Sequence, residues 1–519
     1  MKSLITFFIA LFTLNLTAQT QSSSLDYNNS RVTILNGGDF FWDLTSSRYE
    51  VPKTPLGSVR KCTIFSGAVW MGGVDQDHNL RLAAMTYRQQ GKDFIPGPIS
   101  DSSGSSSNYD IIYRVTKDEI NAHIKNPANA SGSILDWPGN GDTSKGEPYQ
   151  LAPFIDVNSN GKYEPTMGDY PKIKGIAATY CVYNDKTVHT ASTGQPILIE
   201  VHQMFYQDTI THNGLLIDDV NLASFTLINR GPSSISDFVF GIYTDFDLGN
   251  HVDDFVGSDS VRNMVYVYNA DDVDEGIRGY GLNPPAQSMM FLNHRMGSAI
   301  SFNNNYNPVD GNPSIASDYY KYLNARFKDG SLLNHPMGYI TKYAFSGDPV
   351  RGTGWIEKDT TGVSPGGDRR MVAGSEPFKL NPNEPICFDI AYVHGRIGLG
   401  GPTASIDVMR EKADIVQSAY NHNTYGWKTS NCQLGANEQE TTGIFYNHQK
   451  AHFYLYPNPS MGLYHIENLK TNGESRITDP SGKTVRIIQP EANQIDIQDL
   501  ESGVYFLQTE LGTFRLLKL

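Results

Sequence analysis

The residues best suited to chemistry lie in one acidic stretch, TDFDLGNHVDDFVGSD (244–259), which contains no lysine or arginine. Its acids are Asp245, Asp247, Asp253, Asp254 and Asp259. Two carboxylates about 4 Å apart repel by about 4 kcal/mol at an effective dielectric constant near 20, so these side chains must spread into water or share a cation. Asp245 and Asp247 are two residues apart at the end of an expected strand, so they point to the same side. We therefore expect an oxygen cage for calcium, closed by Asp253, Asp254, Asp259 and backbone carbonyls.

Two alternatives to a calcium site remain open for this stretch: a solvated acidic loop, and a catalytic pair formed by Asp245 and Asp253. Glycosidases use two carboxyl groups about 5–10 Å apart, one of them kept protonated by apolar surroundings. Exposed aromatic side chains would then hold the sugar, and Trp70, Trp355 and Tyr280 are candidates. Nothing in the sequence gives one aspartate an apolar pocket and its neighbour a polar one, so we expect all of them to be equally solvated.

A second cation loop is predicted at DVNSNGKYE (156–164), where oxygen-bearing side chains alternate before a glycine. The ligands would be the side chains of Asp156, Asn158 and Asn160, the backbone carbonyl of Lys162, and either Glu164 or Asp169. This order is typical of the first half of a calcium loop, in which Gly161 permits the sharp turn. The twelfth position is Met167 and not the glutamate of an EF-hand. The alternative is a turn closed by hydrogen bonds from the same side chains to the backbone.

Other constellations give weaker signals. Glu200 and His202 lie on one face of an expected strand, with His189 and His212 nearby in sequence. A zinc site from these residues is one interpretation, and hydrogen-bonded strand histidines are the one we favour. The chain contains neither a G-x-S-x-G nor an H-E-x-x-H motif, so the common hydrolase and metalloprotease signatures are absent from it.

The elements that must position these side chains are mostly strands. Tyr, Phe and Trp make up 11% of the 519 residues, and 48 glycines and 27 prolines break the apolar runs. Period-two alternation is clearest in the segments 63–73, 221–231, 237–246 and 263–269. We therefore predict a mostly β protein with a β-sandwich or jelly-roll-like body and one or two helices. Residues 404–423 form the clearest helix, because Ile406, Met409, Ala413, Val416 and Tyr420 make one apolar stripe that would cover a sheet.

The N-terminus predicts export. Lys2 precedes an apolar run from Leu4 to Leu16, which is too short to cross a bilayer. Residues 1–18 are therefore predicted to be a signal peptide that is cleaved after Ala18. No later segment is apolar enough to cross a membrane, so we expect no transmembrane segment in the mature chain. The net charge of −14 argues against nucleic acid as a partner.

The remaining boundaries follow from composition. We expect a flexible lead-in at 19–30, a body at 31–427 that could contain two sub-domains, a polar linker at 428–450 and a separate β-rich unit at 451–519. The four cysteines, Cys62, Cys181, Cys387 and Cys432, are too widely spaced for a zinc site. An exported chain permits disulfides, and four cysteines allow three pairings. Free buried thiols are the alternative.

Three spaced motifs mark the last seventy or so residues: YPNPS (456–460), a turn ending in Gly-Lys, and SGVY (502–505). The motif residues are Tyr456, Pro457, Asn458, Pro459, Gly482, Lys483, Gly503 and Tyr505. This series resembles the C-terminal (type A) sorting domain of type IX secretion system substrates from Bacteroidetes. The resemblance implies a small Ig-like β-sandwich, the type IX translocon and a sortase as partners, and either release or attachment to surface polysaccharide.

Two segments of the body, residues 69–101 and 151–171, resemble uncharacterised large extracellular proteins of the same bacteria. That resemblance implies a shared fold and no particular reaction. The sequence as a whole predicts a secreted or cell-surface protein exported by the type IX route, whose body is a structural or binding module stabilised by calcium. The alternative is a secreted polysaccharide-acting hydrolase that uses an aspartate pair.

Overall fold

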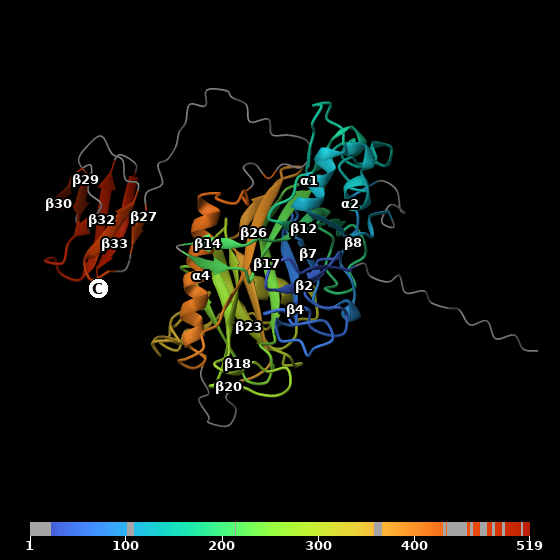
Figure 1. The fold of residues 1–519 in the computed structure, drawn as a ribbon. Helices are drawn as coiled ribbons and strands as arrows, with labels where there is room; N and C mark the ends of the chain where they lie inside the picture. The colour runs from blue at the N-terminus through green and yellow to red at the C-terminus, as the bar shows by residue number, and fades with distance from the viewer. Residues whose placement is uncertain are drawn as a thin grey trace, which may run out of the picture. The chain divides into compact units, whose positions relative to one another are not determined.

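The structure is a computed structural model that describes residues 22–100, 108–212, 214–357, 366–428, 432, 454–456, 460–467, 475–479, 483–489, 494–509 and 512–518. The chain divides into two compact units, residues 1–437 and 438–519. Both units are built from antiparallel sheets (Figure 1). The predicted mostly β fold is confirmed.

The first unit contains a sheet of eleven strands. Along its main path the order is β23 (Met296–Asn303), β24 (Arg369–Ser375), β17 (Ile235–Phe246), β6 (Ser66–Val74), β3 (Asp39–Phe40), β2 (Arg31–Leu35), β4 (Tyr49–Glu50) and β5 (Cys62–Ile64). Three more strands pair beside this path: β1 (Ser22–Leu25) with β2, β7 (Leu80–Ala84) with β6, and β25 (Phe378–Leu380) with β17. The prediction of a flexible lead-in is therefore wrong for β1, because its backbone pairs with β2 over four residues.

A second sheet of nine strands completes the body. Its order is β18 (Asp254–Asp259), β19 (Met264–Asn269), β22 (Ala286–Phe291), β26 (Ile386–Gly395), β16 (Val220–Asn229), β13 (Ile199–Gln207), β12 (Ala177–Asn184) and β8 (Ile95–Pro96), with β9 (Tyr113–Thr116) also paired to β12. Three short ribbons lie outside the sheets: β10 (Phe154–Ile155) with β11 (Tyr170–Pro171), β14 (Ile210–His212) with β15 (Leu215–Ile217), and β20 (Val273–Asp274) with β21 (Gly281–Leu282).

Aromatic side chains from both sheets meet in one core. Phe40 on β3 lies 4.9 Å from Phe205 on β13, measured between ring centroids. Phe240 on β17 stacks on Phe388 of β26 at 4.4 Å. Burying two such apolar faces against each other is what makes a β-sandwich stable. The strands predicted from period-two alternation are confirmed, since β5, β6, β16, β17 and β19 occupy those segments.

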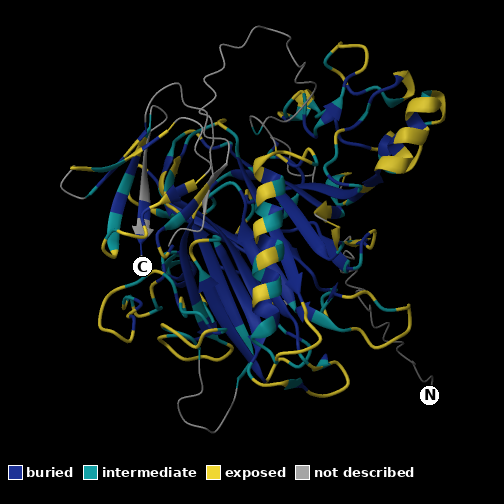
Figure 2. Cartoon of the chain, turned by 60° about the vertical axis from the view of Figure 1, so that its left-hand side comes forward, coloured by how far each residue is buried: buried dark blue, intermediate teal, exposed yellow. Residues whose placement is uncertain are grey.

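The helices cover outer faces of the sheets. The described residues contain four, although the sequence predicts one or two: α1 (Lys117–Lys125), α2 (Gly132–Leu135), α3 (Ala316–Leu323) and α4 (Ala404–Asn421). Four single 3₁₀ turns accompany them: η1 (Arg88–Gln90), η3 (Pro127–Asn129), η4 (Thr143–Lys145) and η5 (Pro165–Met167). All five residues of the predicted α4 stripe are buried. Figure 2 shows α4 with its exposed face outward and its other face on the buried sheet.

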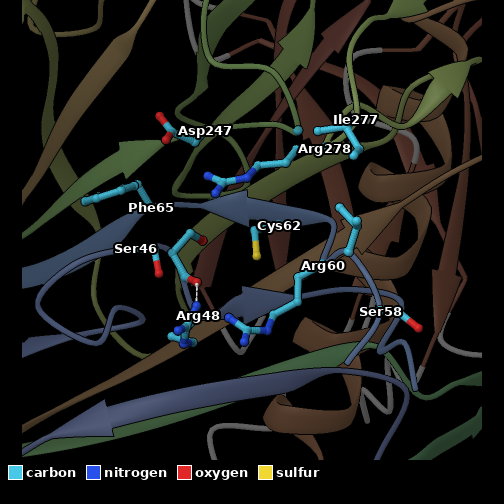
Figure 3. Close-up of a pocket in the computed structure, with 12 residues that line it drawn as sticks. Ser46, Arg48, Ser58, Arg60, Cys62, Phe65, Asp247, Ile277 and Arg278 are labelled. Atoms are coloured by element: carbon cyan, nitrogen blue, oxygen red, sulfur yellow. Dashed lines mark hydrogen bonds between the residues drawn. The ribbon is translucent and has the colours of Figure 1, made fainter. Parts of the chain in front are cut away.

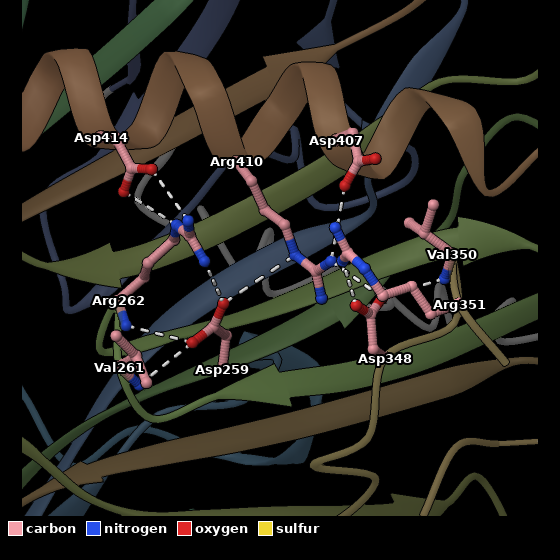
Figure 4. Close-up of polar contacts among 9 residues, drawn as sticks. All are labelled: Asp259, Val261, Arg262, Asp348, Val350, Arg351, Asp407, Arg410 and Asp414. Carbon is pink, nitrogen blue, oxygen red and sulfur yellow. Dashed lines mark hydrogen bonds and ion pairs between the residues drawn. The ribbon is translucent and has the colours of Figure 1, made fainter. Parts of the chain in front are cut away.

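Charged side chains hold α4 to the edge of the second sheet (Figure 4). Arg410 of α4 pairs with Asp348 at 3.0 Å and lies 3.9 Å from Asp259 at the end of β18. Arg262 pairs with Asp259 at 2.8 Å and reaches Asp414 of α4 with two bonds of 2.8 Å. Partial burial of Asp348 raises its pKa, but the hydrogen bonds from Arg351 and Arg410 outweigh this effect and lower the pKa to about 2. The network therefore fixes the helix by charge in addition to its apolar stripe.

One disulfide joins Cys387 on β26 to Cys432, 45 residues later. It closes a loop that contains α4. Cys62, which is half-buried, and Cys181, which is buried, are free thiols. Of the alternatives that the sequence leaves open, the structure thus combines one disulfide with two free cysteines.

The second unit is a small sandwich of two antiparallel sheets. One sheet contains β27 (Tyr454–Tyr456), β28 (Leu463–Glu467) and β31 (Gln494–Asp496), and the other contains β30 (Thr484–Ile488), β29 (Ser475–Thr478), β32 (Gly503–Thr509) and β33 (Gly512–Lys518). Its buried core includes Tyr464, Ile477, Ile495 and Leu507. The predicted small terminal β-sandwich is confirmed. The predicted signal peptide, its cleavage site after Ala18 and most of the predicted 428–450 linker lie outside the described residues.

Candidate functional site

Three carboxylates converge at one end of the first sheet. Asp245, Asp247 and Asp368 bring their oxygen atoms within 4.8 Å of one another. They line a pocket of about 520 Å³, which we call the carboxylate pocket. Its other lining residues are Trp42, Leu44, Thr45, Phe65, Tyr87, Gln90, His251, Arg278, Asn304 and Arg370. Across the described parts of the chain, no other group of three acidic, histidine or cysteine side chains comes this close together.

The strand register explains this convergence. Asp245 lies near the end of β17, and Asp247 follows two residues later, so both side chains point to the same side, as predicted. In the antiparallel neighbour β24, Arg370 stands directly opposite Asp245. Asp368 precedes Arg370 by two residues and therefore joins the same side. The sequence gives no sign of this partner, because the pairing of β17 with β24 is a long-range contact.

Asp245 is almost fully enclosed, with 3% of its surface exposed. Arg370 donates from Nε to one carboxylate oxygen at 3.2 Å, and the Tyr87 hydroxyl donates to the other. Burial raises the pKa of Asp245 to about 6, the neighbouring Arg370 guanidinium lowers it in part, and the negative charge of Asp368 adds to the rise. The expectation that these aspartates are equally solvated is therefore wrong.

Asp247 is half-buried, and its pKa is also raised well above the usual range, first by burial and then by the charge of Asp245. Two carboxylates 4.8 Å apart repel by about 3 kcal/mol at an effective dielectric constant near 20. Arg370 is buried in the pocket and the exposed Arg278 also lines it, so two cations face three acids. The donor set, three hard oxygen ligands around one point, fits calcium or another hard divalent cation. The charge that remains without a cation favours proton binding.

The other predicted acids of this stretch lie elsewhere. Asp259 pairs with Arg262 and contacts Arg410, so arginines and not a cation compensate its charge. Asp254 is fully buried at the start of β18 and accepts a hydrogen bond from the backbone of Leu248 at 3.0 Å. Burial raises its pKa well above the usual range. The predicted cage of five aspartates therefore does not form, because β18 belongs to the other sheet.

Asp253 does not line the carboxylate pocket. It accepts a 3.3 Å hydrogen bond from Asn269, and burial together with the negative charge of Asp274 raises its pKa to about 7. The predicted catalytic pair of Asp245 and Asp253 is thus not brought together in one pocket. Asp247, which the sequence assigned only to a metal site, is the acid that accompanies Asp245.

The loop at 156–169 forms a closed set of turns. The carboxylate of Asp156 accepts from the backbone of Gly161 at 2.6 Å, and the side chain of Asn158 accepts from the backbone of Asn160 at 3.1 Å. Asn160 in turn accepts from the backbone of Lys162 at 2.8 Å. Asp169 is buried and accepts from the backbone of Val157 and Glu164 at 2.9 and 2.7 Å. These bonds are those of the predicted turn alternative, and the same bonds also shape calcium loops.

The histidine candidates do not assemble into a zinc site. Glu200 is buried, and its carboxylate contacts Nε2 of His202 at 3.0 Å and Arg230 at 2.7 Å. His189 instead bonds to the backbone oxygens of Leu82 and Asp185. The favoured interpretation of hydrogen-bonded strand histidines fits these contacts.

Two of the three predicted sugar-stacking aromatics are wrong. Trp70 is fully buried and stacks on Tyr243 in the core. Tyr280 is 6% exposed, and its hydroxyl donates to the backbone of Val51. Their apolar faces are already covered, so no ring is free for a sugar. The aromatic rings that do line the carboxylate pocket are Phe65 and Tyr87, both half-buried, with Trp42 buried behind them.

The sorting-motif residues are described in part. Tyr456 ends β27, the Lys483 backbone donates to Asp479 at 3.0 Å, and Gly503 begins β32. Tyr505 is buried and donates its hydroxyl hydrogen to the backbone of Glu501 at 2.8 Å. Pro457, Asn458, Pro459 and Gly482 lie outside the described residues.

Comparison with known families identifies this second unit. Residues 454–518 match the family described as the secretion system C-terminal sorting domain. The chain is therefore a type IX secretion substrate, and the family implies a Bacteroidetes source. Such a tail implies contact with the type IX machinery and export to the cell surface or beyond it. Within the described residues, no helix has both the length and the apolar composition that a membrane crossing requires.

The body is less similar to known proteins than the terminal unit is. No curated protein matches the chain. Among solved structures, a polysaccharide lyase is similar over 62% of this chain and 34% of its own length, with 8% identity and a TM-score of 0.24. The chain thus spans about a third of that lyase. A TM-score this low carries no argument about the body.

Proposed function

We propose that the body is an extracellular binding module that holds a calcium ion in the carboxylate pocket. The observation that carries the proposal is the approach of the Asp245, Asp247 and Asp368 oxygens to within 4.8 Å of one another. Bringing three acids together costs folding free energy unless a proton or a cation compensates their charge. Outside the cell, free calcium is plentiful enough for a site of this kind to be filled, since extracellular modules commonly bind it weakly.

Electrostatics supports a cation over three bound protons near neutral pH. Asp245 has a pKa of about 6, so it is largely ionised at pH 7.5. Its two oxygens already accept from Arg370 and Tyr87, and these bonds fix the orientation of the carboxylate. Asp368 and Asp247, which would give up its proton to the cation, are the other two oxygen donors. Asp245 would thus position the site, and Asp247 and Asp368 would give it most of its affinity.

Calcium titration by isothermal calorimetry tests this proposal. We expect binding to the wild-type protein, and at least about tenfold weaker binding to Asp247→Asn and Asp368→Asn, because each loses one anionic ligand. Asp237→Asn is the matched control, since Asp237 is an exposed acid on the same strand β17. Asp156→Asn tests the second predicted loop separately. Identical melting curves in calcium and in EDTA would remove the proposal.

A polysaccharide-acting hydrolase is the second candidate. It is favoured by two acids of raised pKa, Asp245 and Asp247, in a pocket that Phe65 and Tyr87 also line. A carboxyl group kept protonated beside an ionised one is the arrangement that general acid catalysis on a glycoside requires. A screen of soluble glycans decides: activity that Asp245→Asn and Asp247→Asn both abolish supports the enzyme. If no glycan is hydrolysed, the hydrolase is ruled out and the proposal of a binding module stands.

A further inference from the structure

A second pocket adjoins the carboxylate pocket and carries the opposite charge. It measures about 400 Å³ and shares Phe65, Asp247 and Arg278 with its neighbour. We call it the cationic pocket, because Arg48 and Arg60 also line it. Figure 3 shows these three guanidinium groups around the pocket, with the Cys62 thiol in its wall. The two pockets together have the size of an ordinary small-molecule site.

The arginines come from separate loops. Arg60 precedes β5, Arg48 precedes β4, and Arg278 lies between β20 and β21. Arg48 is paired with Asp43. Arg60 and Arg278 are exposed, and neither makes an ion pair or a hydrogen bond with any residue that the structure describes. Two guanidinium groups that line one pocket are therefore available to a ligand.

A ligand that fills both pockets needs an anionic group for the arginines and oxygen atoms that can coordinate a cation. A guanidinium fork binds a carboxylate through two parallel hydrogen bonds. In the adjoining carboxylate pocket, hydroxyl or carboxylate oxygens of the ligand would coordinate the calcium ion. The half-buried ring of Phe65 lies between the two and offers an apolar surface to a sugar ring. A chain of uronic acids repeats these three features at every unit.

We propose that the two pockets together bind a short stretch of a uronic-acid polysaccharide, with a carboxylate on Arg60 and Arg278 and the adjoining sugar at the calcium ion. This inference rests on the proposed calcium site. The net charge of −14 repels a long polyanion, so the recognised stretch is short and binding depends on calcium. Long-range attraction of any polyanion is not the driving force.

Calorimetric titration of a short oligogalacturonate into the exported protein, with calcium present, tests the proposal. We expect saturable binding that EDTA abolishes and that Arg60→Gln and Arg278→Gln each weaken by about tenfold, the effect of one charge-assisted hydrogen bond. Arg295→Gln is the control. Arg295 is also an exposed arginine, with 78% of its side chain exposed. It lines neither pocket, and its contact with Glu376 is long at 3.8 Å. Both test residues are exposed and unpaired, so the variants should fold. Arg60→Gln should leave calcium affinity unchanged, because Arg60 does not line the carboxylate pocket, and Arg278→Gln should raise it, because a positive charge near Asp247 is removed.

The outcomes separate the two proposals. Calcium binding without oligogalacturonate binding overturns the inference and leaves the calcium site intact. Sugar binding that persists in EDTA and in Asp247→Asn overturns the inference, and the absence of calcium binding in the direct titration overturns the calcium site. Equal binding of a neutral maltooligosaccharide, or of a sulfated oligosaccharide of the same length, also overturns the inference, because the arginines would then not be selecting a carboxylate.

Discussion

Replacing Asp247 with asparagine should make the calcium-free protein more stable and at the same time less sensitive to calcium. The carboxylates of Asp245, Asp247 and Asp368 lie within 4.8 Å of one another. Arg370 bonds to Asp245 and lies 3.9 Å from Asp368. Arg278 lies near Asp247, so the repulsion that the substitution removes is that between Asp247 and the other two acids. At this 4.8 Å limit and an effective dielectric constant near 20, one such pair repels by about 3 kcal/mol. Asparagine keeps the shape of the side chain and removes this repulsion.

The pH dependence follows from the raised pKa of Asp247. The folded state holds a proton that the unfolded state has released, so stability in EDTA falls as pH rises above the unfolded value near 4. Asp245, with a pKa of about 6, acts in the same direction over pH 4 to 6. Asp247→Asn should flatten this fall. Calcium at a hundred times its dissociation constant should stabilise the wild type by about 2.7 kcal/mol and the variant by much less.

Urea unfolding followed by tryptophan fluorescence at pH 7.5, in EDTA and in calcium, measures these differences. We expect the free energy of unfolding of Asp247→Asn in EDTA to exceed that of the wild type by up to about 3 kcal/mol. Asp237→Asn should behave like the wild type in both conditions. A variant that is less stable than the wild type in EDTA, and that calcium stabilises to the same extent, would refute the reasoning.

Three further predictions concern the rest of the molecule. Replacing Cys387 and Cys432 with serine should lower the free energy of unfolding by about 4 kcal/mol, because the bond closes a loop of 45 residues; Cys62→Ser is the control, and four free thiols in the native protein would contradict the pairing. Burial alone would raise the pKa of Glu200, but a buried histidine and an arginine lower it to about 2. The stability that Glu200 adds, about 3 kcal/mol, should therefore be present above pH 4.5 and lost as pH falls toward 2. Urea unfolding should show that the wild type exceeds Glu200→Gln in free energy of unfolding by more at pH 6 than at pH 3. An equal difference at both pH values would contradict this prediction. Deleting residues 454–518 should keep the chain inside its host, which fractionation and immunoblotting would show, and normal release of the truncated chain would contradict the sorting role.

The strands and the longest helix could be predicted because their signals are local. Alternation with period two marks residues 237–246, and strand β17 is found there. The apolar stripe from Ile406 to Tyr420 recurs every three to four residues, and α4 buries those side chains. The terminal sorting unit could be recognised for the same reason, since its motifs are short and contiguous.

Only the part of the site that depends on residues close together in sequence could be predicted. The spacing of Asp245 and Asp247 places both on one side of a strand, and they do share a pocket. Nearness in sequence also predicts Asp259 in that site, but Asp259 lies on β18 in the other sheet and pairs with Arg262. The chemistry of Trp70 alone predicts a surface for stacking a sugar, and the complete burial of this side chain rules that out.

By itself, then, the sequence determined where the polypeptide is sent and which segments become strands, since both depend on residues close together along the chain. Only the tertiary structure decided that Asp368 and Arg370 meet Asp245, and that Arg60 and Arg278 face one pocket. These contacts depend on the register between strands that are distant in sequence and on which loops lie at the same edge of the sheets. Both are set by the packing of many side chains across the whole core.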